Sequence, residues 1–145
     1  MKKINKITLI LRGYTLDEAR LIAEEANKYP NCFNLEITTN TVDWENIIRQ
    51  LIAGNYENLI IGAGTVLNKE LLEKAIDAGS QFVLSPICMD KQMLDYCKEK
   101  EVLSVPAAFS PSEIYEMYIN GADVIKLFPA ADLPARYIKY ILAPL

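Results

Sequence analysis

The feature that most constrains the fold of this chain is an unbroken alternation of short apolar runs and longer amphipathic runs. Six apolar runs, each bounded by turn-forming residues, are each followed by a segment with helical periodicity. Strict alternation of this kind predicts a parallel sheet whose strands are joined by right-handed helical crossovers. The expected strands are residues 7–11, 33–38, 59–61, 82–85, 103–105 and 124–128, and the expected helices are residues 15–28, 42–53, 68–78, 91–100, 110–121 and 135–142.

Local signals mark where several of these helices begin and end. Thr15 is followed three residues later by Glu18, which is the spacing of a capping box. Gly79 follows the third expected helix and is typical of the residue just beyond a helix C-terminus. No linker, low-complexity tract or change in composition divides the chain, so we expect a single domain over residues 1–145.

Polar residues along the expected strands help to choose between an open sheet and a barrel. In a doubly wound sheet both faces are covered by helices, so the strands are continuous apolar runs. Here Asn34, Glu36 and Thr38 alternate with Leu35 and Ile37, and polar residues gather toward the ends of the strands. This pattern favours a barrel whose mouth holds the active site. Such barrels have eight βα units and this chain has six, so we expect an α/β fold of the parallel (β/α) TIM-barrel type with six of eight units.

The composition is that of an ordinary globular protein, with 51% hydrophobic and 23% charged residues. The formal net charge of −4 offers no basic surface for nucleic acid or for an anionic membrane. The chain contains no apolar stretch long enough for a membrane span and no signal-peptide pattern at its start. We therefore expect a cytoplasmic protein that binds neither nucleic acid nor membranes.

The absence of histidine limits the chemistry that this chain can perform. It excludes histidine-based triads, histidine metal sites and histidine acid–base catalysis. The cysteines, Cys32, Cys88 and Cys97, are odd in number and lack paired spacing, which argues against a disulfide framework and against a zinc site. Any catalysis must therefore use Lys, Glu, Asp, Tyr, Cys or Ser, and we expect no metal.

Lys126 lies in the middle of the last apolar run, residues 124–128. A lysine rarely enters a protein interior, because its ammonium group loses solvation there. Desolvation favours the neutral amine, and a neutral amine can attack a carbonyl carbon to form a Schiff base. The alternative is a lysine whose stem covers the end of the strand and whose amine extends into solvent.

Two further charged residues lie in or beside apolar strands. Glu36 lies within Leu35-Glu36-Ile37, where a carboxylate without a partner is unfavourable. It could form a structural ion pair with Arg12 or Lys126, or it could act as the general acid–base that imine chemistry requires. Arg12 ends the first strand, where its planar guanidinium suits a carboxylate, although an ordinary surface arginine is equally compatible with this position.

The segment Gly62-Ala63-Gly64-Thr65 joins an expected strand to the following helix. Glycines allow a ligand to approach the backbone, and Thr65 offers a hydroxyl and an amide; the alternative is that the turn alone requires the glycines. Pro86 and Pro106 follow the fourth and fifth strands, where proline ends a strand or lines a pocket. Cys88 is expected to be a small packed side chain.

Taken together, these residues resemble a known family, the class I 2-keto-3-deoxy-6-phosphogluconate (KDPG) / 4-hydroxy-2-oxoglutarate (KHG) aldolases. Within it, the chain is most similar to the 2-dehydro-3-deoxy-6-phosphogalactonate aldolases. The segments IGAGTVL (61–67) and KLFPA (126–130) are specific to the family in this order and spacing. The other matching segments are ILRG (10–13), DEA (17–19), LEI (35–37), AGSQF (78–82), SP (85–86), PSEI (111–114) and GAD (121–123).

The resemblance implies a (β/α)8 barrel, usually a homotrimer, that needs no metal or other cofactor. It implies cleavage of a 2-keto-3-deoxy-6-phospho-sugar acid to pyruvate and glyceraldehyde 3-phosphate, with a small 2-keto acid as the ligand. The implied roles are Lys126 as the Schiff-base lysine, Glu36 as the proton shuttle, Arg12 and Thr65 at the carboxylate end, and Pro86 and Phe128 as walls of the pocket.

Asn40 bears on which branch of the family the chain resembles. The gluconate-type enzymes carry an arginine there, whereas the galactonate-type enzymes carry an asparagine followed shortly by a tryptophan, as Asn40 and Trp44 do here. The chain departs from the family pattern at Ala107, where a glycine is common, and at Thr38-Thr39, which replace a more apolar pair.

Members of the family continue for two further βα units, whose glycine-rich turns hold the substrate phosphate. The chain therefore resembles a C-terminally truncated barrel, and we expect impaired phosphate binding and open edges on the first and sixth strands, which favour self-association. Two alternatives remain open. One is a catalytically inactive truncated paralogue that acts only as a self-associating α/β module. The other is a different phosphate-binding barrel enzyme, which would not need Lys126 and Glu36 together.

Overall fold

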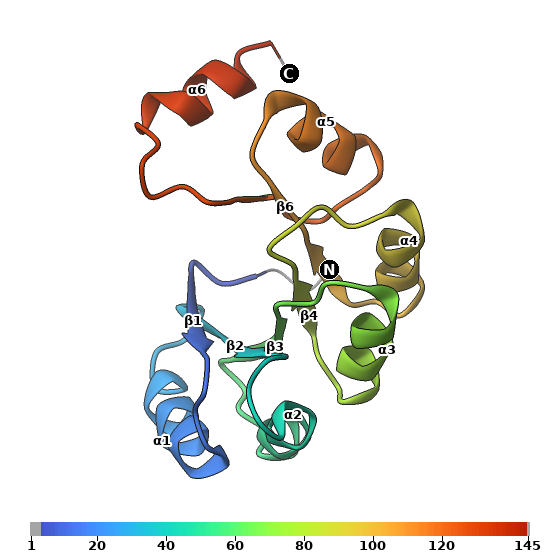
Figure 1. Cartoon of the computed structure of the whole chain (residues 1–145). Coiled ribbons are helices and arrows are strands. Elements are labelled where there is room, and N and C mark those ends of the chain that lie inside the picture. The colour runs from blue at the N-terminus through green and yellow to red at the C-terminus, as the bar shows by residue number, and fades with distance from the viewer. Residues whose placement is uncertain (1–3, 145) are drawn as a thin grey trace.

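The computed structural model describes residues 4–144, and it confirms the alternation of strands and helices that the sequence predicts. Figure 1 shows the helices following one another in an arc around the strands, with α1 and α6 at the two ends of the arc. The strands are β1 (Ile7–Leu11), β2 (Phe33–Thr38), β3 (Ile60–Gly64), β4 (Phe82–Leu84), β5 (Leu103–Val105), β6 (Ala107–Ala108) and β7 (Lys126–Leu127). The helices are α1 (Leu16–Ala26), α2 (Trp44–Ala53), α3 (Lys69–Asp77), α4 (Lys91–Glu99), α5 (Pro111–Ile119) and α6 (Arg136–Leu142).

The order of the strands decides between the two expected architectures. Strands β1 to β5 form one parallel sheet in sequence order, and β6 pairs with β7, also in parallel. A doubly wound sheet would reverse its strand order at a switch point, and none occurs in the described part of the chain. The fold is therefore α/β of the TIM-barrel type, with six βα units among the residues that the structure describes.

The two faces of the strands have different partners. The outer face packs against the helices in the main hydrophobic core, which includes Leu35, Ile37 and Ile61. The inner face carries the polar side chains of β2 and a smaller apolar cluster formed by Phe82, Leu84, Leu103 and Val105. The inner face is thus filled by side chains, as in a barrel interior, and its polar part lies on β2.

Side-chain caps define where several helices begin. Thr15 and Glu18 form the predicted capping box before α1, and Ser110 and Glu113 form a second one before α5. The prediction that the second helix begins at residue 42 was wrong. Asp43 has a left-handed backbone, with φ 59°, so α2 begins at Trp44 and Val42 lies 89% exposed in the preceding turn. A residue with a left-handed backbone cannot belong to a right-handed helix, so α2 cannot include Asp43 or the residues before it.

The last strand differs from its prediction. Residues 124–128 were expected to form one buried strand, but β7 contains only Lys126 and Leu127, both half-buried, and Phe128 is 42% exposed. The backbone of this segment runs alongside residues 104–108. The N–H groups of Val124, Lys126 and Phe128 donate to the carbonyl oxygens of residues 104, 106 and 108, respectively. Within residues 4–144 no strand covers the other side of β7, and its side chains therefore remain partly exposed.

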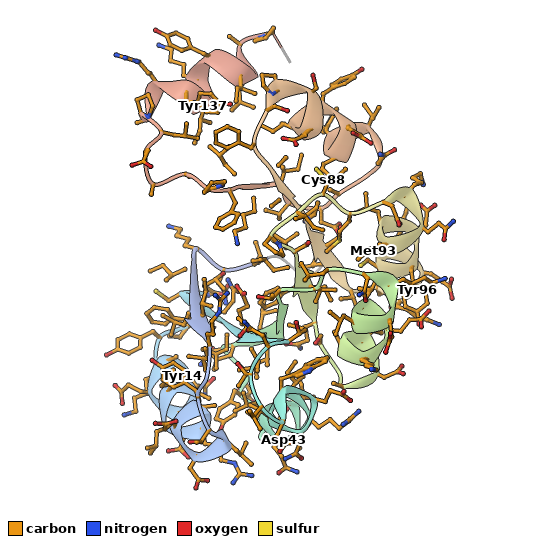
Figure 2. All side chains as sticks on the ribbon, in the orientation of Figure 1. Tyr14, Asp43, Cys88, Met93, Tyr96 and Tyr137 are labelled. Atoms are coloured by element: carbon orange, nitrogen blue, oxygen red, sulfur yellow. The ribbon has the colours of Figure 1, made fainter. Side chains whose placement is uncertain are left out.

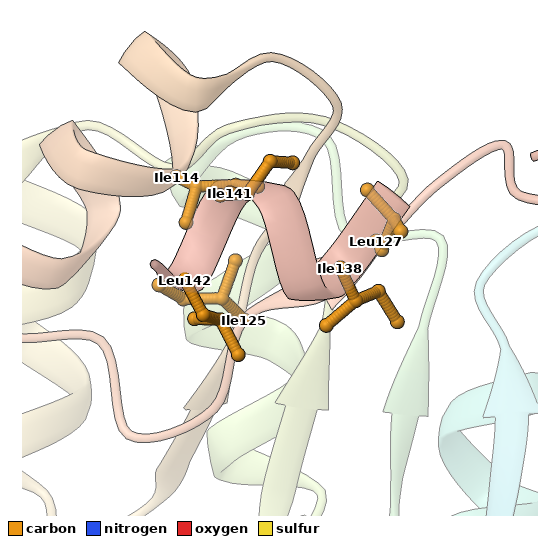
Figure 3. Close-up of a pocket in the computed structure, with 6 residues that line it drawn as sticks. All are labelled: Ile114, Ile125, Leu127, Ile138, Ile141 and Leu142. Carbon is orange, nitrogen blue, oxygen red and sulfur yellow. The ribbon is translucent and has the colours of Figure 1, made fainter. Parts of the chain in front are cut away.

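The two edges of the sheet remain open in the described part of the chain. β1 pairs only with β2, and β7 pairs only with β6. Beside β7, helix α6 packs loosely over a cavity of about 260 Å³ that lies between α5, β7 and α6 (Figure 3). The residues that line it are Ile114, Ile125, Leu127, Ile138, Ile141 and Leu142. No helix among the described residues is both long enough and apolar enough to cross a bilayer.

Candidate active site

Glu36 lies on the inner face of β2, beside Gly64 of β3. Its residue is only 2% exposed, and its Oε2 atom has no hydrogen-bond partner among the described residues. Burial raises the pKa of the Glu36 carboxyl, while the positive charges of Lys126 and then Arg12 act in the opposite direction. A buried carboxyl with a raised pKa and a free oxygen is suited to exchanging protons with a ligand.

Two glycines of β3 create the space for this inner face. A Cβ atom on Gly64 would lie 1.7 Å from Oε1 and 2.3 Å from Cδ of Glu36. A Cβ atom on Gly62 would lie 2.2 Å from the carbonyl oxygen of Phe82. Both glycines lie inside the strand, and neither has a positive φ. The sequence suggested that these glycines admit a ligand or form a turn; within β3, they leave room for Glu36 and Phe82.

Lys126 lies on the last strand, β7. Its Nζ atom is 4.3 Å from the centre of the Phe128 ring, a distance at which the ammonium and the ring attract each other. No carboxylate in the described part of the chain lies within 4.0 Å of this amine, so the structural ion pair with Glu36 considered from the sequence does not form. Its positive charge nevertheless acts on Glu36. The amine is half-buried, not fully buried as expected.

Arg12 and Thr65 meet at the C-terminal ends of β1 and β3. The Nη2 group of Arg12 donates to Oγ1 of Thr65 over 3.4 Å, which is long for a hydrogen bond. Arg12 is exposed, and it lies close enough to Glu36 for its charge to act on that carboxyl. A guanidinium and a hydroxyl in contact form a polar region that could hold a small carboxylate.

Thr39 forms a contact with Thr65 that the sequence did not predict. Its Oγ1 donates to the carbonyl oxygen of Thr65 over 2.7 Å, and its backbone N–H donates to the carbonyl of Gly64 over 2.9 Å. Thr65 needs such support, because its φ of 61° is unusual for a β-branched residue. The one available signal was the replacement of an apolar pair by Thr38-Thr39.

Asn40 and Pro86 lie just after the C-terminal ends of β2 and β4, as expected. Within residues 4–144, neither side chain forms a hydrogen bond with the other candidate site residues. Asn40 is exposed in the turn after β2, and Pro86 is half-buried after β4. No side-chain hydrogen bond within residues 4–144 connects Asn40 to Lys126, Glu36, Arg12 or Thr65. Trp44 is 9% exposed and packs in the main core, so any effect it has on a ligand passes through neighbouring residues.

Cys88 and Cys97 are poor candidates for an alternative nucleophile. All three are free, and burial raises the pKa of Cys97 to about 12. Burial also raises the pKa of Cys88, so its thiol stays protonated near neutral pH. The thiolate is the nucleophilic form of cysteine. Among residues 4–144, no group of three His, Cys, Asp or Glu side chains is arranged to hold a metal ion.

The fold and the site define a class of protein: a (β/α) barrel-type domain in which the charge of a lysine acts on a buried carboxyl, and in which Arg12 contacts Thr65 at the C-terminal ends of the strands. In proteins of this architecture, that end of the strands holds the active site. The sequence model of the KDPG and KHG aldolases matches residues 3–145, and the chain belongs to this family.

Relatives and solved structures agree with this membership. The chain is 41% identical over 96 residues to 2-dehydro-3-deoxy-phosphogluconate aldolase from Pseudomonas aeruginosa, an alignment that covers 66% of this chain and 43% of the relative. A solved structure described as native KDPGal superimposes with a TM-score of 0.85 and 27% identity, covering all of this chain and 70% of that one. A KDPG aldolase from Legionella pneumophila, with pyruvate captured as a covalent carbinolamine, gives a TM-score of 0.75 at 27% identity, covering 92% and 63%. The chain thus spans less than half the length of the Pseudomonas relative.

Proposed function

We propose that this chain is a Schiff-base (class I) aldolase that forms a covalent imine with a 2-keto acid at Lys126. The observation that carries the proposal is the almost fully buried Glu36 carboxyl, on which the positive charge of Lys126 acts. The pyruvate adduct of the Legionella relative supports it, because that adduct is the first covalent intermediate of the same chemistry.

In the proposed reaction, Nζ of Lys126 attacks the keto carbon, and the carbinolamine loses water to give a protonated imine. The protonated imine accepts the electron pair of the bond between the α and β carbons as that bond breaks, which gives an enamine. Glu36 takes the proton of the substrate hydroxyl at this step, so the departing fragment leaves as an aldehyde. The resulting enamine is protonated on carbon, and hydrolysis of the imine releases pyruvate and restores the amine. The raised pKa of Glu36 brings its proton affinity closer to neutral pH, where a general acid–base works best.

We assign the carboxylate of the 2-keto acid to Arg12 and Thr65. Their contact lies at the mouth of the strands, and Arg12 provides the charge that neutralises the ligand. Phe128 lies against the amine and Pro86 follows β4, so both would line the pocket. We propose a 2-keto-3-deoxy-6-phospho-sugar acid as the substrate and pyruvate and glyceraldehyde 3-phosphate as the products. Asn40 and the full-length superposition on the KDPGal structure favour the galactonate form.

A second candidate function is a self-associating α/β module without catalysis. The open edges of β1 and β7 within residues 4–144, and exposed apolar side chains such as Ile10 at 51%, favour association with other copies. Association is also compatible with the enzyme, and we propose a cytoplasmic homo-oligomer, with a trimer as the leading arrangement. A monomer in sedimentation equilibrium at micromolar concentration would contradict this part of the proposal.

Turnover separates the two candidates. The purified chain would be assayed for pyruvate release, coupled to lactate dehydrogenase, from both the phosphorylated gluconate and galactonate acids. The aldolase predicts activity that disappears in Lys126→Ala and falls by about a hundredfold in Glu36→Gln, which is typical for the loss of a general acid–base. Activity that survives in Lys126→Ala would refute imine chemistry, and no turnover on either acid would leave the module as the function.

A further inference from the structure

The turn between β2 and α2 contacts both neighbouring loops through threonine side chains that the proposed imine chemistry does not use. On one side, Oγ1 of Thr39 donates to the carbonyl oxygen of Thr65 over 2.7 Å. On the other side, Oγ1 of Thr41 accepts a hydrogen bond from the backbone N–H of Gly13 over 2.9 Å. Thr41 is 4% exposed, and its hydroxyl lies 3.0 Å from that of Thr38. The turn therefore joins the loop after β1 to the loop after β3.

Each of these loops has an unusual backbone at the contact. Gly13 has φ +77° and Thr65 has φ 61°, both in the left-handed region. A β-branched residue in this region is strained and persists only where its surroundings fix it. The hydroxyl of Thr39 supplies such a contact, because it binds the carbonyl group of the strained residue itself. Figure 2 labels two residues near the Gly13–Thr41 contact: Tyr14, which directly follows Gly13, and Asp43, which lies two residues after Thr41.

The residues that the turn holds are the two assigned to the ligand carboxylate. Arg12 immediately precedes Gly13, and Thr65 is bound directly. Their own contact, from Nη2 to Oγ1, measures 3.4 Å and is too long to fix either side chain. Their separation is thus set by the backbones that carry them, and both backbones are anchored to the same turn.

We propose that Thr39 and Thr41 are positioning residues, which hold Thr65 and Arg12 as a pair for the carboxylate of the 2-keto acid. This inference rests on the proposed function. Neither threonine touches the reacting carbon; each acts through the residue whose loop it anchors. Loss of either hydroxyl should weaken binding of the carboxylate and leave the reactivity of the Lys126 amine unchanged.

The test uses isosteric variants and two measurements. Thr39→Val and Thr41→Val each remove one hydroxyl at nearly constant volume, and Thr39→Ser restores the hydroxyl. Thr8→Val is the matched control, because Oγ1 of Thr8 also bonds across β1 and β2, to Nδ2 of Asn34 over 3.0 Å, at the opposite end of these strands. Pyruvate binding is measured by NMR titration in a Lys126→Ala background, where no imine forms. The rate of adduct formation at saturating pyruvate is measured by borohydride trapping in chains that retain Lys126.

We expect each valine variant to raise the dissociation constant for pyruvate about fivefold, the effect of one lost hydrogen bond, with an unchanged rate of trapping at saturation. Thr39→Ser should bind as the parent does, and so should Thr8→Val. Equal affinity of the parent and both valine variants would overturn the positioning role while leaving the aldolase proposal intact. Pyruvate binding that depends on Thr39 and Thr41, without any adduct in the unsubstituted chain, would support the positioning role and refute the aldolase. No binding of pyruvate by the parent would overturn both.

Discussion

Replacement of Gly64 by alanine tests whether the Glu36 carboxyl occupies the space above β3. The new Cβ atom would lie 1.7, 2.3 and 2.6 Å from Oε1, Cδ and Cγ of Glu36, and these three are its nearest neighbours. Carbon and oxygen atoms in contact need about 3.2 to 3.5 Å, so the whole carboxyl must move by more than an ångström. Overpacking of this kind destabilises a core by about 1 to 3 kcal/mol. We expect a loss of about 2 kcal/mol in the free energy of unfolding, measured by urea denaturation at neutral pH.

The cause of this loss can be separated by a second substitution. In a Glu36→Ala background the obstructing atoms are absent, so Gly64→Ala should become neutral or stabilise the fold by up to about 1 kcal/mol, because alanine restricts the unfolded chain. Gly62→Ala is the matched control. Its Cβ would meet the backbone oxygen of Phe82 at 2.2 Å, so its cost should persist in the Glu36→Ala background. Equal destabilisation by Gly64→Ala in both backgrounds would refute the placement of Glu36 in this space.

The remaining predictions concern the Glu36 carboxyl and the contact between Asp123 and Ser104. Burial raises the pKa of Glu36 in the folded state, so the folded protein binds more protons than the unfolded one between the two pKa values, and the free energy of unfolding should fall as pH rises through that window. Glu36→Gln should remove this fall and become more stable relative to the parent as pH rises above the ordinary pKa of glutamate, about 4.3, as urea denaturation at several pH values would show; a relative loss would contradict a raised pKa. Asp123 accepts hydrogen bonds from the N–H and the hydroxyl of Ser104, each over 2.8 Å, and Ser104 is 1% exposed. Asp123→Ala should therefore reduce the free energy of unfolding by about 2 kcal/mol, whereas the exposed Asp132→Ala should change it by less than about 0.5 kcal/mol, and equal effects would show that the Ser104 contact contributes nothing.

Most of the fold can be predicted from the sequence because strands and helix ends are determined by residues that are close together in the chain. Residues 33–38 were predicted as a strand and β2 has those bounds, since polar and apolar side chains alternate along all of it. The capping box at Thr15 was predicted correctly for the same reason, because its two partners lie three residues apart. Where a turn residue adopts a left-handed backbone without being glycine, as Asp43 does, the sequence carries no signal and the helix start was misplaced.

The last strand and the details of the site depend on contacts between distant segments. The extent of β7 is set by its pairing with Ala107 and Ala108 beyond Pro106, and the exposure of Lys126 is set by the absence of a neighbouring strand within residues 4–144. Neither can be derived from residues 124–128 alone. The contact from Thr39 to Thr65 spans 26 residues and depends on the left-handed backbone of Thr65, so periodicity could not reveal it. That the charge of Lys126 acts on Glu36 could be expected, because both are charges in apolar strands.

Borohydride trapping with pyruvate tests the central claim most directly. The chain would be incubated with pyruvate, reduced and digested, and the mass of each lysine-containing peptide would be measured, with Lys126→Arg as the control that keeps the charge. A primary amine forms an imine and a guanidinium does not, so the account predicts a pyruvate-derived mass increase on the Lys126 peptide of the parent and none on that peptide of the variant. An adduct spread over the exposed lysines, or none at residue 126, would contradict it.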